Sequence, residues 1–146
     1  MSNAFFSSRA FAVVGASADP SKFGNKVLNW YINNGMKVTP INPKESQIEG
    51  IACQKSLTAL AASLSSESCS DNGALENIGV SVITPPSVSG KVLQEAAQLG
   101  VKNIWFQPGS EPDNWQAVTR ELGINALGNG ACVLKVDPST LPKSKL

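Results

Sequence analysis

A short apolar run that ends in small residues most constrains the fold of this chain. Residues 10–14 (AFAVV) contain no polar side chain and are followed by Gly15-Ala16-Ser17. Such a run is typical of a strand buried on both faces of a parallel sheet. Residues 23–32 then repeat apolar side chains at helical spacing, and residues 37–41 are a second strand, whose Pro40 favours a sheet edge or an early end of the strand. Strand, helix and strand within about thirty residues predict a βαβ unit with a right-handed crossover.

The same alternation of strand and helix patterns continues through the rest of the sequence. We therefore predict an α/β, Rossmann-like, doubly wound and mainly parallel sheet of about five to six strands in a single domain. The domain is expected to span residues 9–136, with a polar insertion at 64–79, between an N-terminal extension (1–8) and a C-terminal tail (137–146). The further predicted elements are a hairpin-like segment at 48–53, helices at 56–64, 87–100 and 111–122, and strands at 80–83, 101–106, 124–127 and 132–136.

The composition excludes several classes of function. Twelve basic and eleven acidic residues leave a net charge of +1, so no broad basic field attracts nucleic acid or a membrane surface. No apolar run approaches the roughly 18 residues of a membrane span, and the N-terminus lacks the pattern of a secretory signal, so a cytoplasmic location is expected. The absence of histidine removes histidine-based triads, histidine metal sites and phosphohistidine intermediates.

Cysteine and carboxylate side chains give no catalytic pattern either. Cys53, Cys69 and Cys132 stand at wide spacings without a Cys-x-x-Cys pair, so we expect free thiols and no metal site. Glu111 and Asp113 are placed in the first turn of a predicted helix, where a carboxylate compensates the helix dipole. No catalytic residue is predicted. Packing in the core accounts for the aromatic residues Trp30, Tyr31, Trp105, Phe106 and Trp115.

Small, polar or rigid residues follow five of the predicted strands. Ligands of open parallel sheets bind outside the carboxyl ends of the strands, near the point where strand order reverses. These residues therefore describe the rim of a predicted cleft. They are Gly15-Ala16-Ser17, Asn42-Pro43-Lys44, Thr84-Pro85-Pro86, Gln107-Pro108-Gly109 and Gly128-Asn129-Gly130.

The first of these loops favours a phosphate ligand but not an ordinary NAD site. A loop of small residues that feeds a helix N-terminus brings backbone N–H groups to one point, which suits a phosphate. Gly15 could equally serve only a tight turn, and Ser17 only a local turn. The G-x-G-x-x-G fingerprint is absent, because Ala16 and Ser17 follow Gly15 and the next glycine is Gly24.

Two further loops bear on the kind of nucleotide. An enzyme that uses NAD would carry an acidic residue near the end of the second strand to hold the ribose hydroxyls. The chain has Lys44 there, which suits a ribose phosphate of the kind found in NADP and coenzyme A, or is simply a solvated lysine. Pro85 and Pro86 offer a flat apolar wall to an adenine or a pantetheine arm, or only a rigid connection.

The order of these motifs resembles the CoA-binding domain family. VVGAS, VTPINPK, the G-x-x-C-Q-K-S-L segment and SVITPPSVSG follow one another across residues 9–136. The family includes small stand-alone proteins and the N-terminal domain of the succinyl-CoA synthetase α subunit. The resemblance implies a Rossmann-like fold with CoA along the carboxyl edge of the sheet. Its implied cofactor-binding residues are Gly15, Ala16, Ser17, Lys22, Phe23, Gly24, Asn42, Pro43, Lys44, Thr84, Pro85, Pro86, Gln107 and Cys132.

The resemblance also indicates what this chain is not expected to do. Many relatives carry an Asn/Arg-Cys-Pro segment near the thiol end of CoA, whereas here Val133 follows Cys132. The synthetase uses a phosphorylated histidine and a partner subunit, and this chain has no histidine. We therefore expect binding of CoA or an acyl-CoA without catalysis. Two alternatives stay open: a NAD(P)-binding Rossmann protein or vestigial oxidoreductase, and a module in which Cys132 exchanges with a thiol. The oligomeric state is open between a monomer and a homodimer.

Overall fold

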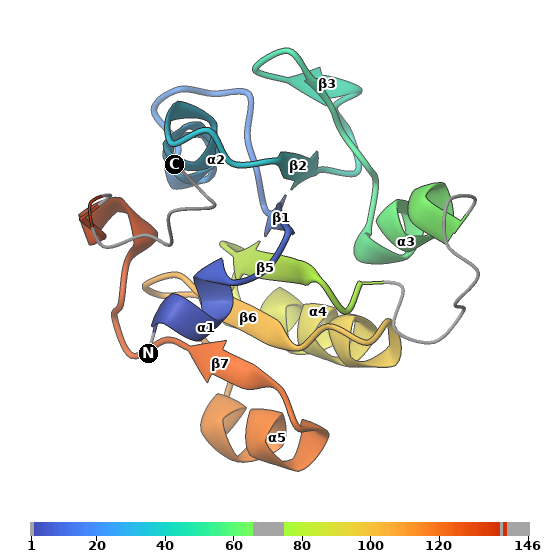
Figure 1. Cartoon of the computed structure of the whole chain (residues 1–146), viewed down its shortest axis with the longest axis vertical. Coiled ribbons are helices and arrows are strands. Elements are labelled where there is room, and N and C mark those ends of the chain that lie inside the picture. The colour runs from blue at the N-terminus through green and yellow to red at the C-terminus, as the bar shows by residue number, and fades with distance from the viewer. Residues whose placement is uncertain (1, 66–74, 138, 140–146) are drawn as a thin grey trace.

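Five parallel strands form the centre of the structure. The computed structural model describes residues 2–65, 75–137 and 139. All four strand pairings in the sheet are parallel, and the strand that contains Pro40 lies at an edge, as expected. The Rossmann-like sheet is therefore confirmed. Its strands, in the order β2-β1-β5-β6-β7 (Figure 1), are β1 (Ala10–Val14), β2 (Val38–Ile41), β5 (Ile78–Val82), β6 (Asn103–Phe106) and β7 (Asn125–Leu127).

The strand order decides which face each helix covers. The chain runs outward from β1 to β2, then returns past β1 to β5 and continues outward on the other side. Right-handed crossovers in opposite directions put helices on opposite faces. Accordingly α2 (Phe23–Asn33) covers one face, and α3 (Leu57–Ser65), α4 (Pro86–Gln98) and α5 (Trp115–Leu122) cover the other. The direction reverses between β1 and β5, which is where open sheets of this kind bind ligands.

Each face of the sheet carries its own hydrophobic cluster, because successive strand residues point to opposite sides. Ala12 faces the cluster under α3 and α4, whereas Phe11 faces the cluster under α2. The α2 residue Tyr31 reaches the sheet, where its hydroxyl group hydrogen-bonds that of Ser81 at 2.5 Å. Burial raises the pKa of Tyr31 far above its usual value. This buried hydroxyl pair therefore stays uncharged and fixes α2 against β5.

The first residues of the chain supply part of this second cluster. Helix α1 (Ser2–Phe6) brings Phe5 and Phe6 to 0 % and 1 % exposure. The ring of Phe5 meets Trp105 edge to face at 5.4 Å, and Phe6 lies 6.0 Å from Phe11. Burying a phenylalanine contributes about 1.5–3 kcal/mol. The segment 1–8, expected as an extension, thus places two large side chains in the core.

The middle of the chain contains the predicted hairpin-like segment and a shorter polar stretch than expected. Strands β3 (Gln47–Ile48) and β4 (Ile51–Ala52) form a two-stranded antiparallel ribbon. The insertion expected at 64–79 overlaps regular structure at both ends, since α3 continues to Ser65 and β5 begins at Ile78, with Leu75 fully buried. The rest of that stretch, residues 66–74 with Cys69, lies outside the described residues.

In the last third of the chain, one predicted helix starts later than expected and one predicted strand is wrong. Helix α5 begins at Trp115 rather than at 111, because Asn114 adopts a left-handed conformation with φ of +58° that interrupts a helix. The strand expected at 132–136 is instead a short 3-10 helix, η1 (Val133–Lys135). Its first N–H group, that of Val133, donates to the side-chain oxygen of buried Gln107 at 3.0 Å rather than to a neighbouring strand.

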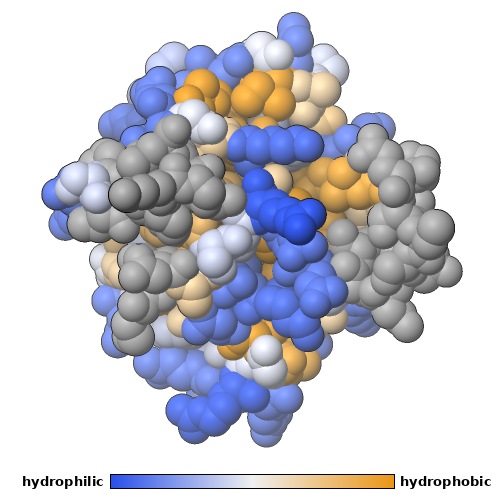
Figure 2. All heavy atoms as spheres, in the orientation of Figure 1, coloured by the Kyte–Doolittle hydropathy of each residue, from blue (hydrophilic) through white to orange (hydrophobic). Residues whose placement is uncertain are grey.

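The surface shows no dominant apolar face on the side drawn in Figure 2. Hydrophilic residues cross its centre, and the exposed apolar patches between them are small and separate. Patches of this size are ordinary on soluble domains. A homodimer therefore stays a prediction. Within the described residues, no helix is both long and apolar enough to cross a bilayer.

Candidate ligand-binding cleft

Three hollows follow one another along the carboxyl ends of the strands. The first hollow, about 290 Å³, is lined by Gly15, Asn42 and Lys55 among others, and the middle hollow, about 540 Å³, by Phe23 and Pro85. The outer hollow, about 490 Å³, lies at the ends of β6 and β7. Thr84 lines both the first and the middle hollow, and Cys132 and Lys135 line both the middle and the outer hollow. The three hollows therefore form one row of adjacent hollows across all five strand ends, which we call the cleft, and these three residues are their shared walls.

The loop after β1 is held close to the start of α2 by two glycines. Gly15 has a φ of +97°, and a Cβ atom there would lie 3.2 Å from the carbonyl carbon of Ile83. A Cβ atom on Gly24 would lie 2.1 Å from the carbonyl oxygen of Gly15, so only glycine allows this approach. These are two of the roles that glycines play in the dinucleotide fingerprint, a tight turn and close helix packing, here at a different spacing.

Side chains within this loop use some of its hydrogen-bonding groups and leave others free. The carboxylate of Asp19 accepts from the N–H and the hydroxyl group of Ser21 at 2.9 and 2.8 Å, and these bonds lower its pKa. Neither residue caps α2: Lys22 holds the N-cap position without a side-chain bond. Among the described residues, no partner accepts from the backbone N–H groups of Ser17, Ala18, Phe23 and Gly24.

Asn42 fixes the loop after β2 rather than offering free polar atoms. Its Nδ2 donates to the carbonyl oxygen of Ala16 at 2.9 Å, and its Oδ1 accepts from the backbone N–H groups of Lys44 and Glu45 at 2.7 and 3.0 Å. The side-chain amide of Asn25 similarly donates to the carbonyl oxygen of Ser17 at 2.9 Å. Buried or half-buried amides of this kind hold the two loops in one arrangement.

The structure adds a second cation at this end of the cleft. Lys44 is exposed and lines none of the three hollows, whereas Lys55, which we did not predict, lines the first one. An isolated parallel bridge between Ile41 and Gln54 carries the chain back beside the end of β2. That long-range pairing, which has no local sequence signal, explains why Lys55 was missed.

The loop after β5 is rigid and lies at the centre of the cleft. The hydroxyl group of Ser89 donates to the carbonyl oxygen of Thr84 at 3.1 Å, and the two hydroxyl oxygens lie 2.8 Å apart. Pro85 is the N-cap of α4 and lines the middle hollow, and Pro86 is the first helical residue, where a missing N–H costs nothing. Pro85 and Thr84 thus present a preformed wall.

Two side chains, Gln107 and Glu111, hold the loops at the outer end of the cleft in place. Gln107 is fully buried and anchors Val133 of η1, while its Nε2 has no partner among the described residues. Glu111 accepts from the N–H of Gly109 at 2.9 Å and from that of Gly130 at 3.2 Å, so it joins the loops after β6 and β7. Burial raises the pKa of Glu111, but the backbone N–H groups around it outweigh this and hold the pKa below its usual value.

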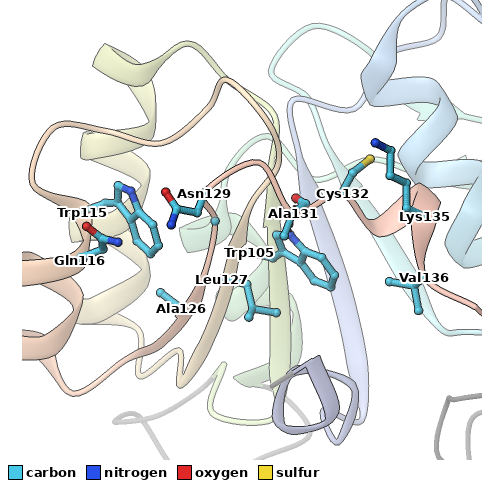
Figure 3. Close-up of a pocket in the computed structure, with 11 residues that line it drawn as sticks. Trp105, Trp115, Gln116, Ala126, Leu127, Asn129, Ala131, Cys132, Lys135 and Val136 are labelled. Carbon is cyan, nitrogen blue, oxygen red and sulfur yellow. Dashed lines mark hydrogen bonds between the residues drawn. The ribbon is translucent and has the colours of Figure 1, made fainter.

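Cys132 and Lys135 form the boundary between the middle and the outer hollow. Figure 3 shows them at one end of the outer hollow, with Trp115 at the other end and Trp105 and Leu127 between. Cys132 is half-buried and Lys135 is exposed. The sequence predicts a strand at 132–136, so it does not predict that Lys135 lines the cleft. Cys53 lies elsewhere, and burial, with the charge of Glu45, raises its pKa.

The predicted site residues divide into two groups. Some line the cleft directly: Gly15, Ala16, Phe23, Asn42, Pro43, Thr84, Pro85 and Cys132. The others, Ser17, Lys22, Gly24, Lys44, Pro86 and Gln107, line none of the three hollows, and Gln107 and Gly24 are buried supports.

Comparisons with known proteins converge on one family. The sequence profile described as "CoA binding domain" matches residues 9–137. The chain is similar to the alpha subunit of acetate–CoA ligase (ADP-forming) II from Pyrococcus furiosus, with 29% identity across 68% of this chain and 19% of that protein. It is also similar to an acetate–CoA ligase (ADP-forming) from Methanocaldococcus jannaschii, with 32% identity across 64% of this chain and 12% of that protein. The chain thus spans less than a fifth of the length of these two relatives.

A solved structure extends the likeness to the whole fold. A conserved hypothetical protein from Pyrococcus furiosus is 32% identical, with a TM-score of 0.70. The match covers 86% of this chain and 97% of that one. The predicted family resemblance is therefore confirmed, whereas no comparison supports the NADP alternative.

Proposed function

The chain belongs to the CoA binding domain family, and we propose on this basis that it binds coenzyme A along the carboxyl edge of its sheet without catalysing a reaction of its own. The observation that carries the proposed pose is the extended cleft, in which three hollows share their boundary residues across all five strand ends. An elongated ligand with a nucleotide at one end and a thiol at the other fits such a cleft better than a compact one.

In the proposed pose, the diphosphate lies at the loop between Gly15 and Gly24. The partnerless N–H groups of Ser17, Ala18 and the first residues of α2 support this placement, because they combine donors with a helix N-terminus. The adenosine end occupies the first hollow, and the pantetheine arm passes Thr84 and Pro85 through the middle hollow. The thiol then ends near Cys132.

Two lysines are proposed to hold the ribose 3′-phosphate. Lys44 follows β2 as expected from the sequence, and Lys55 lines the first hollow. A charge-assisted hydrogen bond contributes about 1.5–3 kcal/mol. Each lysine is therefore expected to strengthen binding only of ligands that carry this phosphate.

The names of the two similar proteins support CoA as the proposed ligand but support no reaction for this chain. Both are acetate–CoA ligases, and the chain matches a small part of each. We propose that this part holds CoA, and that ligase chemistry needs protein groups that the chain does not supply. The absence of histidine supports this limit, since no phosphohistidine can form.

Isothermal titration calorimetry with CoA and dephospho-CoA tests the proposal. We expect CoA to bind saturably and about tenfold more tightly than dephospho-CoA, which corresponds to about 1.4 kcal/mol. Lys55→Ala and Lys44→Ala should reduce this difference, whereas Lys91→Ala should not, because Lys91 is exposed on α4 and lines no hollow. No saturable binding of CoA at millimolar concentration would overturn the proposed function, and equal affinities of the two ligands would overturn the assignment of the lysines.

A further inference from the structure

The outer hollow lies beyond the point where the thiol of CoA would end. We infer that it holds the acyl group of a CoA thioester, and that the preferred ligand carries an apolar acyl group larger than acetyl. This inference rests on the proposed binding of CoA. It goes further because it assigns a ligand class to a hollow that the nucleotide and the pantetheine arm leave unused.

Continuity with the middle hollow is the first argument. Cys132 and Lys135 line both hollows, so the two hollows lie side by side and share these two side chains as their boundary. Figure 3 shows these two side chains on one side of Trp105 and Leu127 and Trp115 on the other, and all five residues line the outer hollow. A chain attached to sulfur near Cys132 would therefore reach the outer hollow at this shared boundary.

The chemistry of the walls is the second argument. Beyond the entrance the hollow is lined by carbon surface from Trp105, Trp115, Leu127 and other apolar residues. The indole N–H of Trp105 is already donated to the carbonyl oxygen of Ala131 at 2.9 Å, and the ring is 2 % exposed, so Trp105 backs the hollow without offering it a free polar group. The two lining residues with polar amides, Gln116 and Asn129, are both exposed. Such walls favour a hydrocarbon group over a polar one.

The size of the hollow is the third argument. An engineered cavity of about 150 Å³ already holds benzene. The outer hollow measures about 490 Å³, within the range of about 300–1,000 Å³ found for small-molecule sites. An acetyl group would leave most of this apolar volume to water, whereas an acyl chain of six carbons would displace more of that water.

The hollow is also preformed rather than dependent on the ligand. Trp115 packs edge to face on Phe106 at 5.9 Å, and a Cβ atom on Gly128 would lie 2.9 Å from its ring. Glu111 holds Gly130 from the other side. A rigid apolar site loses little free energy to ordering when a ligand binds. Each acyl carbon that is added should therefore increase the affinity.

Calorimetric titration of the full chain with CoA, acetyl-CoA and hexanoyl-CoA tests the inference. Each buried methylene contributes about 0.8 kcal/mol, which is roughly fourfold in affinity. Because the hollow is partly open, we expect hexanoyl-CoA to bind at least about tenfold more tightly than acetyl-CoA, and acetyl-CoA to bind about as tightly as CoA.

Variants locate the gain. Ala126→Trp fills the hollow and Trp115→Ala removes one wall, so both should abolish most of the advantage of hexanoyl-CoA. Leu134→Ala is the matched control, because Leu134 is exposed beside Lys135 and does not line the hollow. Unchanged affinity for CoA itself shows that each variant is folded.

The outcomes separate the two proposals. If CoA binds but hexanoyl-CoA binds within about twofold of acetyl-CoA, the inference about the outer hollow is wrong and the proposed function stands. A hexanoyl advantage that survives in both Ala126→Trp and Trp115→Ala would also overturn it, because the acyl group would then lie elsewhere. Absence of binding by all three ligands would overturn the proposed function and the inference together.

Discussion

The contact between Gly24 and Gly15 allows a sharp test of the loop that we assign to the diphosphate. A Cβ atom on residue 24 would lie 2.1 Å from the carbonyl oxygen of Gly15, and that oxygen belongs to backbone that cannot rotate away. Ordinary contact begins near 3.4 Å, so Gly24→Ala must move α2 or the loop by more than 1 Å. Overpacking costs about 1–3 kcal/mol and sometimes more, and we expect about 3 kcal/mol here because the obstacle is backbone.

Thermal unfolding followed by circular dichroism measures this cost. For a chain of this length, about 3 kcal/mol corresponds to a fall in Tm of roughly 10 °C. Gly90→Ala is the matched control, since its Cβ atom would meet only Pro112 at 3.8 Å inside helix α4, and removing a helical glycine should raise stability by about 0.5–1 kcal/mol. A Tm of Gly24→Ala within about 2 °C of the wild type would refute the argument that this close approach shapes the loop.

Two further substitutions test the polar contacts of the core and of the cleft. Tyr31→Phe leaves the buried hydroxyl group of Ser81 without its partner and should lower the free energy of unfolding in urea by about 1–3 kcal/mol. The double variant that also carries Ser81→Ala should recover part of this loss. If the single and the double variant lose the same free energy of unfolding, a direct bond between the two hydroxyl groups is contradicted. The pKa of Glu111 in the folded state lies below its usual 4.5, so its contribution to stability is present above the unfolded pKa and is lost as pH falls through the folded value. Thermal melts of the wild type and Glu111→Gln should therefore differ by a small amount at pH 7, because solvent reaches the half-buried carboxylate and screens its charge, and should converge at acidic pH. A difference in Tm that is independent of pH would show that the charge plays no part.

Local patterns in the sequence were sufficient to predict the five parallel strands of the sheet, but not their order or the absence of a strand at 132–136. The apolar run at β1 matches its burial along the strand, and Gly35, with φ of +71°, follows the end of α2, where a left-handed glycine is common. Pro40 indicated an edge strand because proline has no N–H group to donate to a neighbouring strand. Each of these signals depends on residues that are close together in the chain, so periodicity and turn chemistry could reveal them.

The parts that escaped prediction depend on contacts between distant residues. The short helix η1 forms where Gln107, from the end of β6, supplies the acceptor for the N–H of Val133. Glu111 acts as a clamp between two loops rather than as a helix-dipole partner. Lys55 reaches the first hollow through the bridge from Ile41 to Gln54. No window of neighbouring residues contains both members of these pairs.

Trp105 gives the N-terminal helix an influence on the far end of the cleft. One side of its indole ring supports Phe5, and its N–H group holds the carbonyl oxygen of Ala131 just before Cys132. The side chain of Trp105 therefore connects helix α1 to the boundary of the outer hollow. A tag, a fusion or a truncation that displaces Phe5 would therefore also displace the ring of Trp105 and, through it, Ala131. Such a change would alter the relative affinities for different CoA thioesters before it weakened binding of the nucleotide.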